Sequence, residues 1–574
     1  VYVFPEHKAE GKDFNFHTEI RTMSHFMQEL HRVSGNSENR KWIFVPYDQL
    51  TDQVGPLAKY RPRDVGIVMV ENPWKASLRP YHRQKLALIL SNMRHFALEQ
   101  ARKGVAVRYV VGNGPYRETL ASLSRELGCL EVMQPAEREL RADLQPLIEA
   151  KALKVIPRSG RLCPSDALKA AADRGRQWRM DVFYRYMRKR TGILMHKGTP
   201  VGGKFSFDAQ NRLPWRGAPH APEPCTFPVD PIKREVGNLV SSMFSHHPGT
   251  LCLEELPATK QDADSLWTWA KSNCLEHFGP YEDAMSRSSF ALFHTRISCL
   301  LNIQRLLPLT LIQDVVGMDL PLPSKEAFVR QVLGWREFVS LVHEETDGFR
   351  NIRGESPTVL KFPGDAGYSR VYGTAWQGAG PTGASFGGAC PSYFDAVNPL
   401  PPLYWGVVSG LACLDHVVSG VWKRGYSHHI TRLMVLANFA ALMDVNPREL
   451  TDWFWIAYTD AYDWVVEPNV LGMGTYAVGP LMTTKPYVAG ANYINRMSDY
   501  CQMCQFVPTR TCPLTRLYWA FLARHKHKLH KNPRLSLAMK NLDRRDRALM
   551  DQDKRVYKFI LERISRGERI PPTI

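Results

Sequence analysis

The chain has 574 residues, of which 44% are hydrophobic and 11% aromatic, so it is a folded protein that is too long for one compact core. Lys and Arg outnumber Asp and Glu by 74 to 56, and the net charge of +18 favours a polyanionic partner, nucleic acid before an anionic membrane surface. No apolar run approaches the roughly 18 residues of a membrane-spanning helix, so no membrane insertion is expected.

The chain opens with VYVFPEHKAE, which lacks the pattern of a signal peptide, and most of its 11 cysteines stand alone in the sequence. Isolated thiols are typical of a reducing compartment. We therefore expect a monomeric, cytoplasmic protein, and leave open a targeting peptide trimmed from its start.

Residues 1–40 are polar, apart from a short helical stretch near TMSHFMQELHRV, and are expected to form an N-terminal extension. From 41 to 165, apolar runs such as WIFV and GIVMV alternate with helical patterns such as RQKLALILSNMRHFALEQARKG. This alternation predicts a doubly wound α/β domain with a parallel sheet. Ligands of such sheets bind beyond the carboxyl ends of the strands, where Asp48, Gln49 and Glu71 follow two of the runs.

A basic interdomain linker is expected over residues 166–235, which include the cationic helical pattern RGRQWRMDVFYRYMRKR. From 236 to 574 helical periodicity dominates, which predicts an all-α domain. Residues 363–403 interrupt this periodicity with Gly, Ser, Ala and Pro, and are expected to be a long loop insertion.

Three cysteines lie within twelve residues in CQMCQFVPTRTC, residues 501–512. Three thiolates fit either a structural zinc ion or a [4Fe–4S] cluster. Composition alone favours zinc, because such zinc sites are common. The fourth ligand decides between the two metals.

Three motifs carry a resemblance to a known family. GWREFV (334–339), HHITRLMVLANF (428–439) and TKPYVAGANYINRMSDYCQMC (484–504) resemble motifs of the iron–sulfur bacterial cryptochromes and photolyases, within the photolyase/cryptochrome superfamily. The resemblance implies an α/β antenna-type domain followed by a helical domain that binds FAD. It also implies a [4Fe–4S] cluster on four thiolates, those of Cys413, Cys501, Cys504 and Cys512. The alternative for Cys413 is a core thiol, and the loop between Cys504 and Cys512 is shorter than the family leads us to expect.

The resemblance assigns FAD to two further groups of residues. The phosphates are expected at SRSSFALFHTRIS, and the flavin ring near the GWREFV, HHITRLM and EPNVLGM motifs. The expected cofactor-binding residues are Ser288, Ser289, Thr295, Arg296, Ser298, Trp335, Arg432, Asp460 and Asn469. Trp405 and Trp453 match positions of electron-relay aromatic residues, whereas Phe454 stands where relatives carry Tyr, so a third relay step looks missing.

The resemblance also implies a site for damaged DNA. His428 and His429 would assist proton transfer, and Tyr487 would line the lesion pocket. Arg188, Lys189, Arg190 and Lys204 of the linker would neutralise DNA phosphates around a flipped-out lesion. Asp208 is a candidate ligand for Mg²⁺. One departure bears on activity, because relatives carry WVELPN where this chain has WVVEPN: the glutamate has either moved by one place, to Glu467, or been replaced by Val466.

A ribityllumazine antenna is common in this family, at strand ends that here carry Asp48, Gln49, Leu50 and Glu71. Lys75 stands where an acidic residue is expected, so an empty pocket is the alternative.

We predict a DNA photolyase, a lyase of the (6-4) type, which repairs UV-damaged DNA by electron transfer from excited reduced FAD. The first alternative is a cryptochrome-like blue-light photoreceptor without repair activity, which Val466 and the added segments favour. The second is a non-photochemical nucleic-acid-binding protein with a structural cluster.

Overall fold

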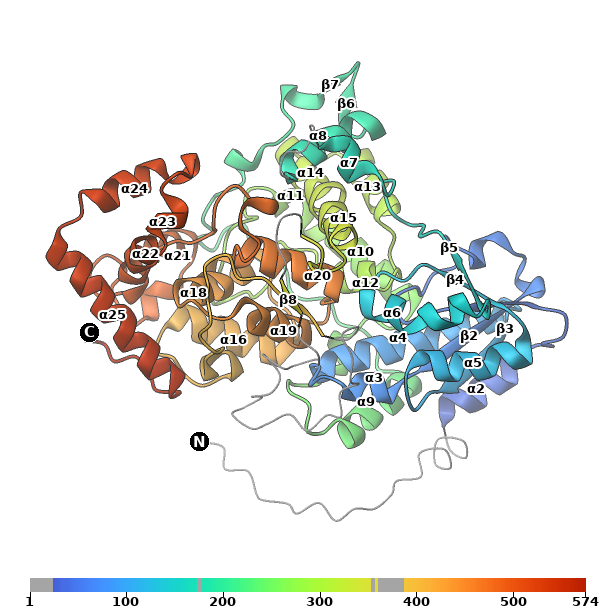
Figure 1. Cartoon of the computed structure of the whole chain (residues 1–574). Coiled ribbons are helices and arrows are strands. Elements are labelled where there is room, and N and C mark those ends of the chain that lie inside the picture. The colour runs from blue at the N-terminus through green and yellow to red at the C-terminus, as the bar shows by residue number, and fades with distance from the viewer. Residues whose placement is uncertain (1–23, 173–177, 353–356, 360–386, 574) are drawn as a thin grey trace, which may run out of the picture.

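Figure 1 shows the computed structural model, with a sheet at one end of the molecule and helices over the rest. The structure describes residues 24–172, 178–352, 357–359 and 387–573. Residues 1–23 of the expected extension and most of the expected insertion lie outside these ranges. Within them, no helix is both long and apolar enough to cross a membrane.

The sheet has five strands, all parallel, in the order β3-β2-β1-β4-β5. The strands are β1 (Lys41–Phe44), β2 (Val65–Glu71), β3 (Ala106–Val111), β4 (Leu130–Met133) and β5 (Leu153–Ile156). Every residue of β2 is buried, as expected for a central strand covered on both faces. The order reverses at β1, so the carboxyl ends of β1 and β4 form the switch point where ligands bind in such sheets. The predicted fold class is confirmed.

Helices α3 (Pro73–Ser77), α4 (Arg83–Arg102), α5 (Tyr116–Leu127) and α6 (Arg138–Glu149) connect the strands. Helix α2 (His25–Val33) precedes β1 and packs against α4 and α9 (Pro231–Met243). Its Phe26 and Leu30 are almost fully buried, so this part of the expected extension belongs to the core. We call residues 24–172 the sheet half.

The connecting segment contains α7 (Ala167–Ala171), α8 (Met180–Thr191) and a small hairpin of β6 (Met195–His196) and β7 (Thr199–Pro200), which projects at the top of Figure 1. Arg188 at the end of α8 is buried, and its guanidinium donates to the carbonyls of Ile193, Leu194 and Phe205. These bonds attach the hairpin to α8.

Residues 231–573, with the gaps given above, form the helical half. After α9, its helices are α10 (Lys260–Asn273), α11 (Leu275–Phe278), α12 (Ser298–Asn302), α13 (Pro308–Gly317), α14 (Leu322–Val329), α15 (Glu337–Glu345), α16 (Ala412–Arg424), α17 (His429–Thr431), α18 (Asn438–Leu442), α19 (Pro447–Ala457), α20 (Asp463–Glu467), α21 (Ala491–Met497), α22 (Pro513–Arg524), α23 (Lys526–Leu529), α24 (Ser536–Asp543) and α25 (Arg547–Ser565). The described helices include π-helical segments at three of the recognised motifs: Arg330–Arg336 joins α14 to α15, Arg432–Ala437 joins α17 to α18, and Pro468–Gly474 follows α20. Such segments are frequent at functional sites.

The base of the expected insertion is closed by a short antiparallel pair, β8 (Thr358–Val359) and β9 (Ala389–Cys390). Arg350 donates to the Gly387 carbonyl, and Arg448 lies against Gly388, where a Cβ atom would come within 2.4 Å of the guanidinium. The insertion therefore leaves and re-enters the fold beside a buried arginine.

Candidate functional site

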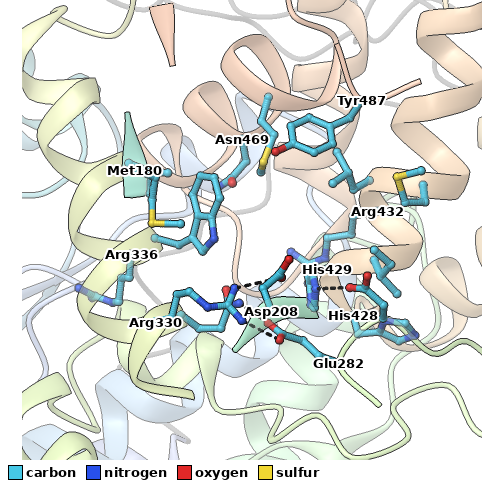
Figure 2. A pocket seen from close by; sticks show the side chains of 18 of the residues that line it. Met180, Asp208, Glu282, Arg330, Arg336, His428, His429, Arg432, Asn469 and Tyr487 are labelled. Carbon is cyan, nitrogen blue, oxygen red and sulfur yellow. Dashed lines mark hydrogen bonds and ion pairs between the residues drawn. The ribbon is translucent and has the colours of Figure 1, made fainter. Parts of the chain in front are cut away.

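The three π-helical segments surround one large cavity of about 1440 Å³, which we call the central pocket. It exceeds the roughly 300–1,000 Å³ of ordinary small-molecule sites. The predicted site residues that line it are Lys204, Asp208, Thr295, Arg296, Ser298, Trp335, His428, His429, Arg432, Asp460, Asn469 and Tyr487. Figure 2 shows Tyr487 and Asn469 on one side of this space and the two histidines on another. The fold thus brings together residues that are up to 283 positions apart, the separation of Lys204 and Tyr487 (487 − 204).

Two predicted cofactor residues do not line the central pocket. Ser289 Oγ accepts a hydrogen bond from the Leu292 amide at 2.9 Å, and Ser288 Oγ lies 3.0 Å from Ser286 Oγ. Ser288 is exposed. In this structure both hydroxyls make their contacts within their own loop.

The predicted Arg–Asp pair forms a two-pronged contact on the pocket wall. Arg432 Nη1 and Nη2 lie 3.1 and 3.0 Å from the two Asp460 oxygens, and Ser298 Oγ donates to Asp460 at 2.7 Å. Burial opposes ionisation of Asp460, but Arg432 and Ser298 outweigh it and hold the pKa of Asp460 below its usual range. Asp460 is therefore a carboxylate at neutral pH.

The predicted histidine pair is part of a group of three. The ring of His428 is stacked on His294, with centroids 4.5 Å and planes 8° apart. Both rings are buried, and burial is the main reason that the pKa of each lies well below its usual range. Neighbouring positive charge lowers both pKa values further. The sequence did not predict that His294 would contact His428, because it lies 134 positions before it (428 − 294).

His429 differs from His428 in its access to the pocket. Its side chain is 42% exposed, and Nε2 lies 3.9 Å from Asp283 Oδ1. Burial in the deep pocket, then Arg330 and Arg432, lower the pKa of His429 to about 4, while Asp208 acts in the opposite direction. Added negative charge in the pocket would raise this pKa.

An acidic group lies beside these histidines and surrounds Arg330. Arg330 Nη2 lies 3.0 Å from Glu282 Oε2, and Nη1 lies 3.7 Å from Asp208 Oδ1, as the dashed lines in Figure 2 show. Burial raises the pKa of Glu282 to about 7, although Arg330 acts against this. Asp208, the candidate Mg²⁺ ligand, also pairs with Arg212, so a divalent ion would compete with two guanidiniums.

Asn469 lines the central pocket, and its Nδ2 donates to the Val465 carbonyl at 2.8 Å. The amide oxygen and the second N–H of this amide are therefore left for a ligand. Glu467, two positions earlier, is buried away from the pocket and accepts from Arg448 at 2.7 Å and from His343 at 2.8 Å. Glu467 thus belongs to a group of buried ion pairs beside β9, since Arg448 also donates to the Ala389 carbonyl, and neither Val466 nor Glu467 lines the pocket.

The predicted DNA contacts separate into two kinds. Lys189, Arg190 and Lys204 are exposed. Arg188 is fully buried and holds the hairpin, so its guanidinium is directed at main-chain carbonyls and not at solvent. The sequence alone could not show that Arg188 is buried while its neighbours are exposed, because all of them lie in one cationic run.

The four predicted cluster cysteines line one small enclosed cavity between α16 and the loop that follows α21. They are Cys413, Cys501, Cys504 and Cys512. Burial and then the other three thiols raise the pKa of Cys413 well above its usual range.

A tetrahedral zinc ion, with Zn–S bonds of about 2.3 Å, needs its sulfurs only about 3.8 Å apart. Among the described residues, no three His, Cys, Asp or Glu side chains are placed to hold a metal ion in this way. In a [4Fe–4S] cluster, iron and sulfide lie between the thiolates, which are therefore further apart than around one zinc ion.

The predicted antenna residues are mostly occupied by other contacts. Glu71 accepts from Arg94 at 2.8 and 3.0 Å and from Tyr109 at 2.7 Å, Gln49 donates to the Met133 carbonyl, and Leu50 is in the core. Only Asp48 has two buried carboxyl oxygens without a hydrogen-bond partner.

Lys75, the residue that departs from the family pattern, reaches across the sheet edge to Glu137 at 3.1 Å. The residues present therefore fit an antenna poorly, apart from Asp48, and the antenna stays a prediction.

The predicted relay residues lie behind the pocket wall. Trp453 is 1% exposed and Trp405 is 7% exposed. The ring of Trp453 contacts Tyr458 at 6.0 Å, and Tyr458 in turn faces the Arg432 guanidinium at 4.1 Å. One layer of side chains thus separates Trp453 from the pocket wall.

Comparisons with known proteins agree with this architecture. A family model described as deoxyribodipyrimidine photo-lyase-related protein matches residues 43–254. A (6-4) photolyase of Agrobacterium fabrum is 32% identical over 514 residues, which cover 86% of this chain and 94% of that protein. A Synechocystis cryptochrome structure has a TM-score of 0.51 at 13% identity, covering 81% of this chain and 87% of that one. A class III photolyase structure from Agrobacterium tumefaciens has a TM-score of 0.49 at 13% identity, covering 92% and 99%.

The likeness to the cryptochrome structure shows that the two chains share a fold. The sequence identity with the Agrobacterium fabrum photolyase extends over most of both chains and assigns the chain to a narrower group, a family. The chain belongs to the photolyase-related family of iron–sulfur bacterial cryptochromes and photolyases. The family predicted from the motifs is confirmed.

Proposed function

We propose that this protein is a light-driven DNA photolyase that acts on (6-4) photoproducts and binds FAD in the central pocket. The observation that carries the proposal is one cavity that holds the Arg432–Asp460 pair and the His428–His429 pair together. The 32% identity to a (6-4) photolyase supports the same lesion.

FAD bound in this pocket would supply light absorption and one-electron chemistry. Arg296 lines the pocket near the start of α12 and would hold the phosphates, whereas Ser298 donates its hydroxyl proton to Asp460 and would fix that carboxylate. Arg432 and Asp460 present a fixed ion pair to the ring, and Asn469 presents its amide oxygen.

His429 is the proposed proton donor to the lesion, because its side chain opens into the pocket and faces Asp283. His428 is buried against His294 and braces the site. His429 is neutral in the protein alone, given its pKa of about 4. DNA phosphates placed in the pocket would favour its protonated form.

DNA would approach the mouth of the pocket, where Lys204, Arg185 and Arg534 line the rim. Lys189 and Arg190 extend the exposed positive charge along α8. A lesion flipped into the pocket would meet Tyr487 and the histidines.

The cysteine cavity is the proposed [4Fe–4S] site, with Cys413, Cys501, Cys504 and Cys512 as ligands. The loop that carries three of them is tied to the C-terminal segment, because Gln505 donates to the Ile570 carbonyl at 2.9 Å. The cluster would therefore join α16 to the end of the chain.

The second candidate function is a blue-light photoreceptor. One observation favours it, which is that Glu467 is paired with Arg448 and His343 outside the central pocket, so no carboxylate of the segment from Val465 to Asn469 lines the pocket. The same flavin site would serve, with no repair.

The experiment is repair of a (6-4)-containing oligonucleotide by anaerobically purified protein, with flavin reduced and under blue light. Loss of the lesion in the light and not in the dark is expected. Bound flavin without any repair by the reduced protein would leave the photoreceptor, and protein without flavin absorption would contradict both functions.

A further inference from the structure

Trp422, in α16, lies between the two predicted relay residues. Its ring is stacked on Trp405, with centroids 5.4 Å and planes 17° apart. Its edge meets Trp453, with centroids 5.9 Å and planes 89° apart. The three indoles therefore form a continuous line of ring contacts, and Trp422 is its middle member.

Two of these indoles donate to the same carbonyl oxygen, that of Tyr404. The distances are 2.8 Å from Trp422 Nε1 and 2.9 Å from Trp453 Nε1. A main-chain carbonyl accepts a hydrogen bond but does not take up the proton at neutral pH. Each ring therefore keeps its N–H when it loses an electron, and charge can pass between them without a proton transfer.

His82 is also stacked on Trp422, with centroids 5.9 Å and planes 7° apart. Burial lowers the pKa of His82 to about 4, so this imidazole is neutral at pH 7. A neutral ring adds no positive charge that would oppose oxidation of Trp422. The stacked ring of Trp405 stabilises a positive charge on Trp422, as an aromatic face does for any cation.

The other ring neighbours of Trp453 are Tyr404, Phe454 and Tyr458, and each is a poorer place for a positive charge. Tyr404, at 5.2 Å, donates its O–H to the Leu436 carbonyl, which does not take up the proton that an oxidised phenol releases. Phe454, in contact at 5.2 Å, carries no readily oxidised ring. Tyr458 lies 4.1 Å from the Arg432 guanidinium, which disfavours a second positive charge there. The electrostatics therefore direct positive charge away from the pocket, toward Trp422 and Trp405.

We propose that Trp422 is the middle residue of an electron relay that links Trp405 to Trp453, and that it supplies the step that Phe454 cannot. The proposal rests on the proposed flavin pocket. Trp453 gives one electron to the excited group bound there, and Trp422 and Trp405 pass one electron inward to restore it. An external thiol then reduces the Trp405–Trp422 pair. Two thiols give one electron each over two turns, release two protons and form one disulfide.

The test follows reduction of bound flavin in the full-length protein under blue light, with dithiothreitol as the thiol. Trp422→Phe keeps an aromatic ring of similar shape but removes the oxidisable indole. Trp422→Tyr restores an oxidisable ring. Trp519→Phe is the matched control, because Trp519 is also partly buried but contacts Tyr518 and Arg545 instead of the relay.

W422F is expected to lose most of the rate of photoreduction and of the transient absorption of oxidised tryptophan, at equal flavin content. W422Y should recover part of both signals, and W519F should match the wild type. If W422F photoreduces at the wild-type rate, Trp422 is not in the relay. If W422F binds flavin poorly, the transient absorption of W422Y, measured per bound flavin, is used in its place. A W422Y spectrum with the wild-type tryptophan signal and no signal from oxidised tyrosine would overturn the proposal.

Repair by chemically reduced wild-type protein is measured separately. Its absence would overturn the proposed function, while the photoreduction results would still decide the relay.

Discussion

The sheet edge and the central pocket are both places where this fold class binds ligands, but they differ in how their polar side chains are paired. At the sheet edge, Tyr47 and Lys75 both bind Glu137, and Arg79 binds Glu139 at 2.9 Å. The central pocket is a cavity of about 1440 Å³ in which His294 Nε2 and His428 Nδ1 are buried without a hydrogen-bond partner.

Buried polar groups in proteins are almost always paired, so unpaired ones mark a place where another group binds. Among the described residues such atoms occur in both halves, and in the sheet half they include both carboxyl oxygens of Asp48, Ser91 Oγ and Asn92 Oδ1. The halves differ because the unpaired histidines of the helical half line a large cavity, so bound groups are expected there first. The predictions below test this contrast, beginning with the largest effect.

Cys413→Ala should cause loss of iron and of most soluble protein, because metal-binding energy contributes directly to folding where ligands come from distant segments. Iron content and soluble yield measure this. Cys129→Ala is the control, since Cys129 is an exposed thiol of the sheet half and should change neither. Full iron content in the Cys413 variant would remove Cys413 from the ligand set.

Arg432→Leu should destabilise the protein by about 3 kcal/mol and release flavin, because it leaves Asp460 buried without its partner. Arg94→Leu breaks a comparable buried pair with Glu71 in the sheet half. That variant should lose similar stability and keep its flavin. Urea unfolding and flavin absorbance separate the two, and flavin loss in both variants would contradict the contrast between the halves.

Much of the fold was predictable from the sequence, because alternation of apolar runs and the motif order depend on local patterns. The parallel sheet, the helical half and the residues of HHITRLM in the pocket follow from these patterns. Helix α2 was assigned to an extension, since nine residues with two core side chains give too weak a signal.

What could not be predicted depends on contacts between distant segments. His294 and Trp422 belong to the site through ring stacking with His428 and Trp405, and no spacing rule connects them. Arg188 is turned inward by carbonyls of a hairpin that folds back on its own helix. Ser288 was predicted to bind phosphate, because the sequence alone does not distinguish a serine that bonds within its loop from one that binds a ligand.

Asp48→Asn should change the pH dependence of stability. Burial raises the pKa of Asp48 from 3.8 to about 6, so the folded state binds the proton more tightly than the unfolded state. The contribution of Asp48 to stability is therefore lost as pH rises from about 4 to 6, by about 3 kcal/mol in total. The asparagine variant should be more stable than the wild type at pH 8, and no more stable at pH 4.

Urea unfolding of both proteins at the two pH values measures this. Equal stability at pH 8 would mean that the Asp48 carboxylate already has a partner, such as an antenna or an ordered water. The sheet edge would then resemble the central pocket more closely than its ion pairs indicate.

The smallest effect separates two serines that the sequence could not distinguish. Ser298→Ala removes a hydrogen bond to the Asp460 carboxylate, which should weaken flavin binding by about 1.5 kcal/mol, or roughly tenfold. Ser288→Ala removes only a contact with Ser286 in an exposed loop and should leave flavin affinity unchanged. Fluorescence titration of flavin-free protein compares them. Equal weakening by both would show that the loop before α12 closes onto the flavin phosphates, and that the central pocket extends beyond its present wall when flavin binds.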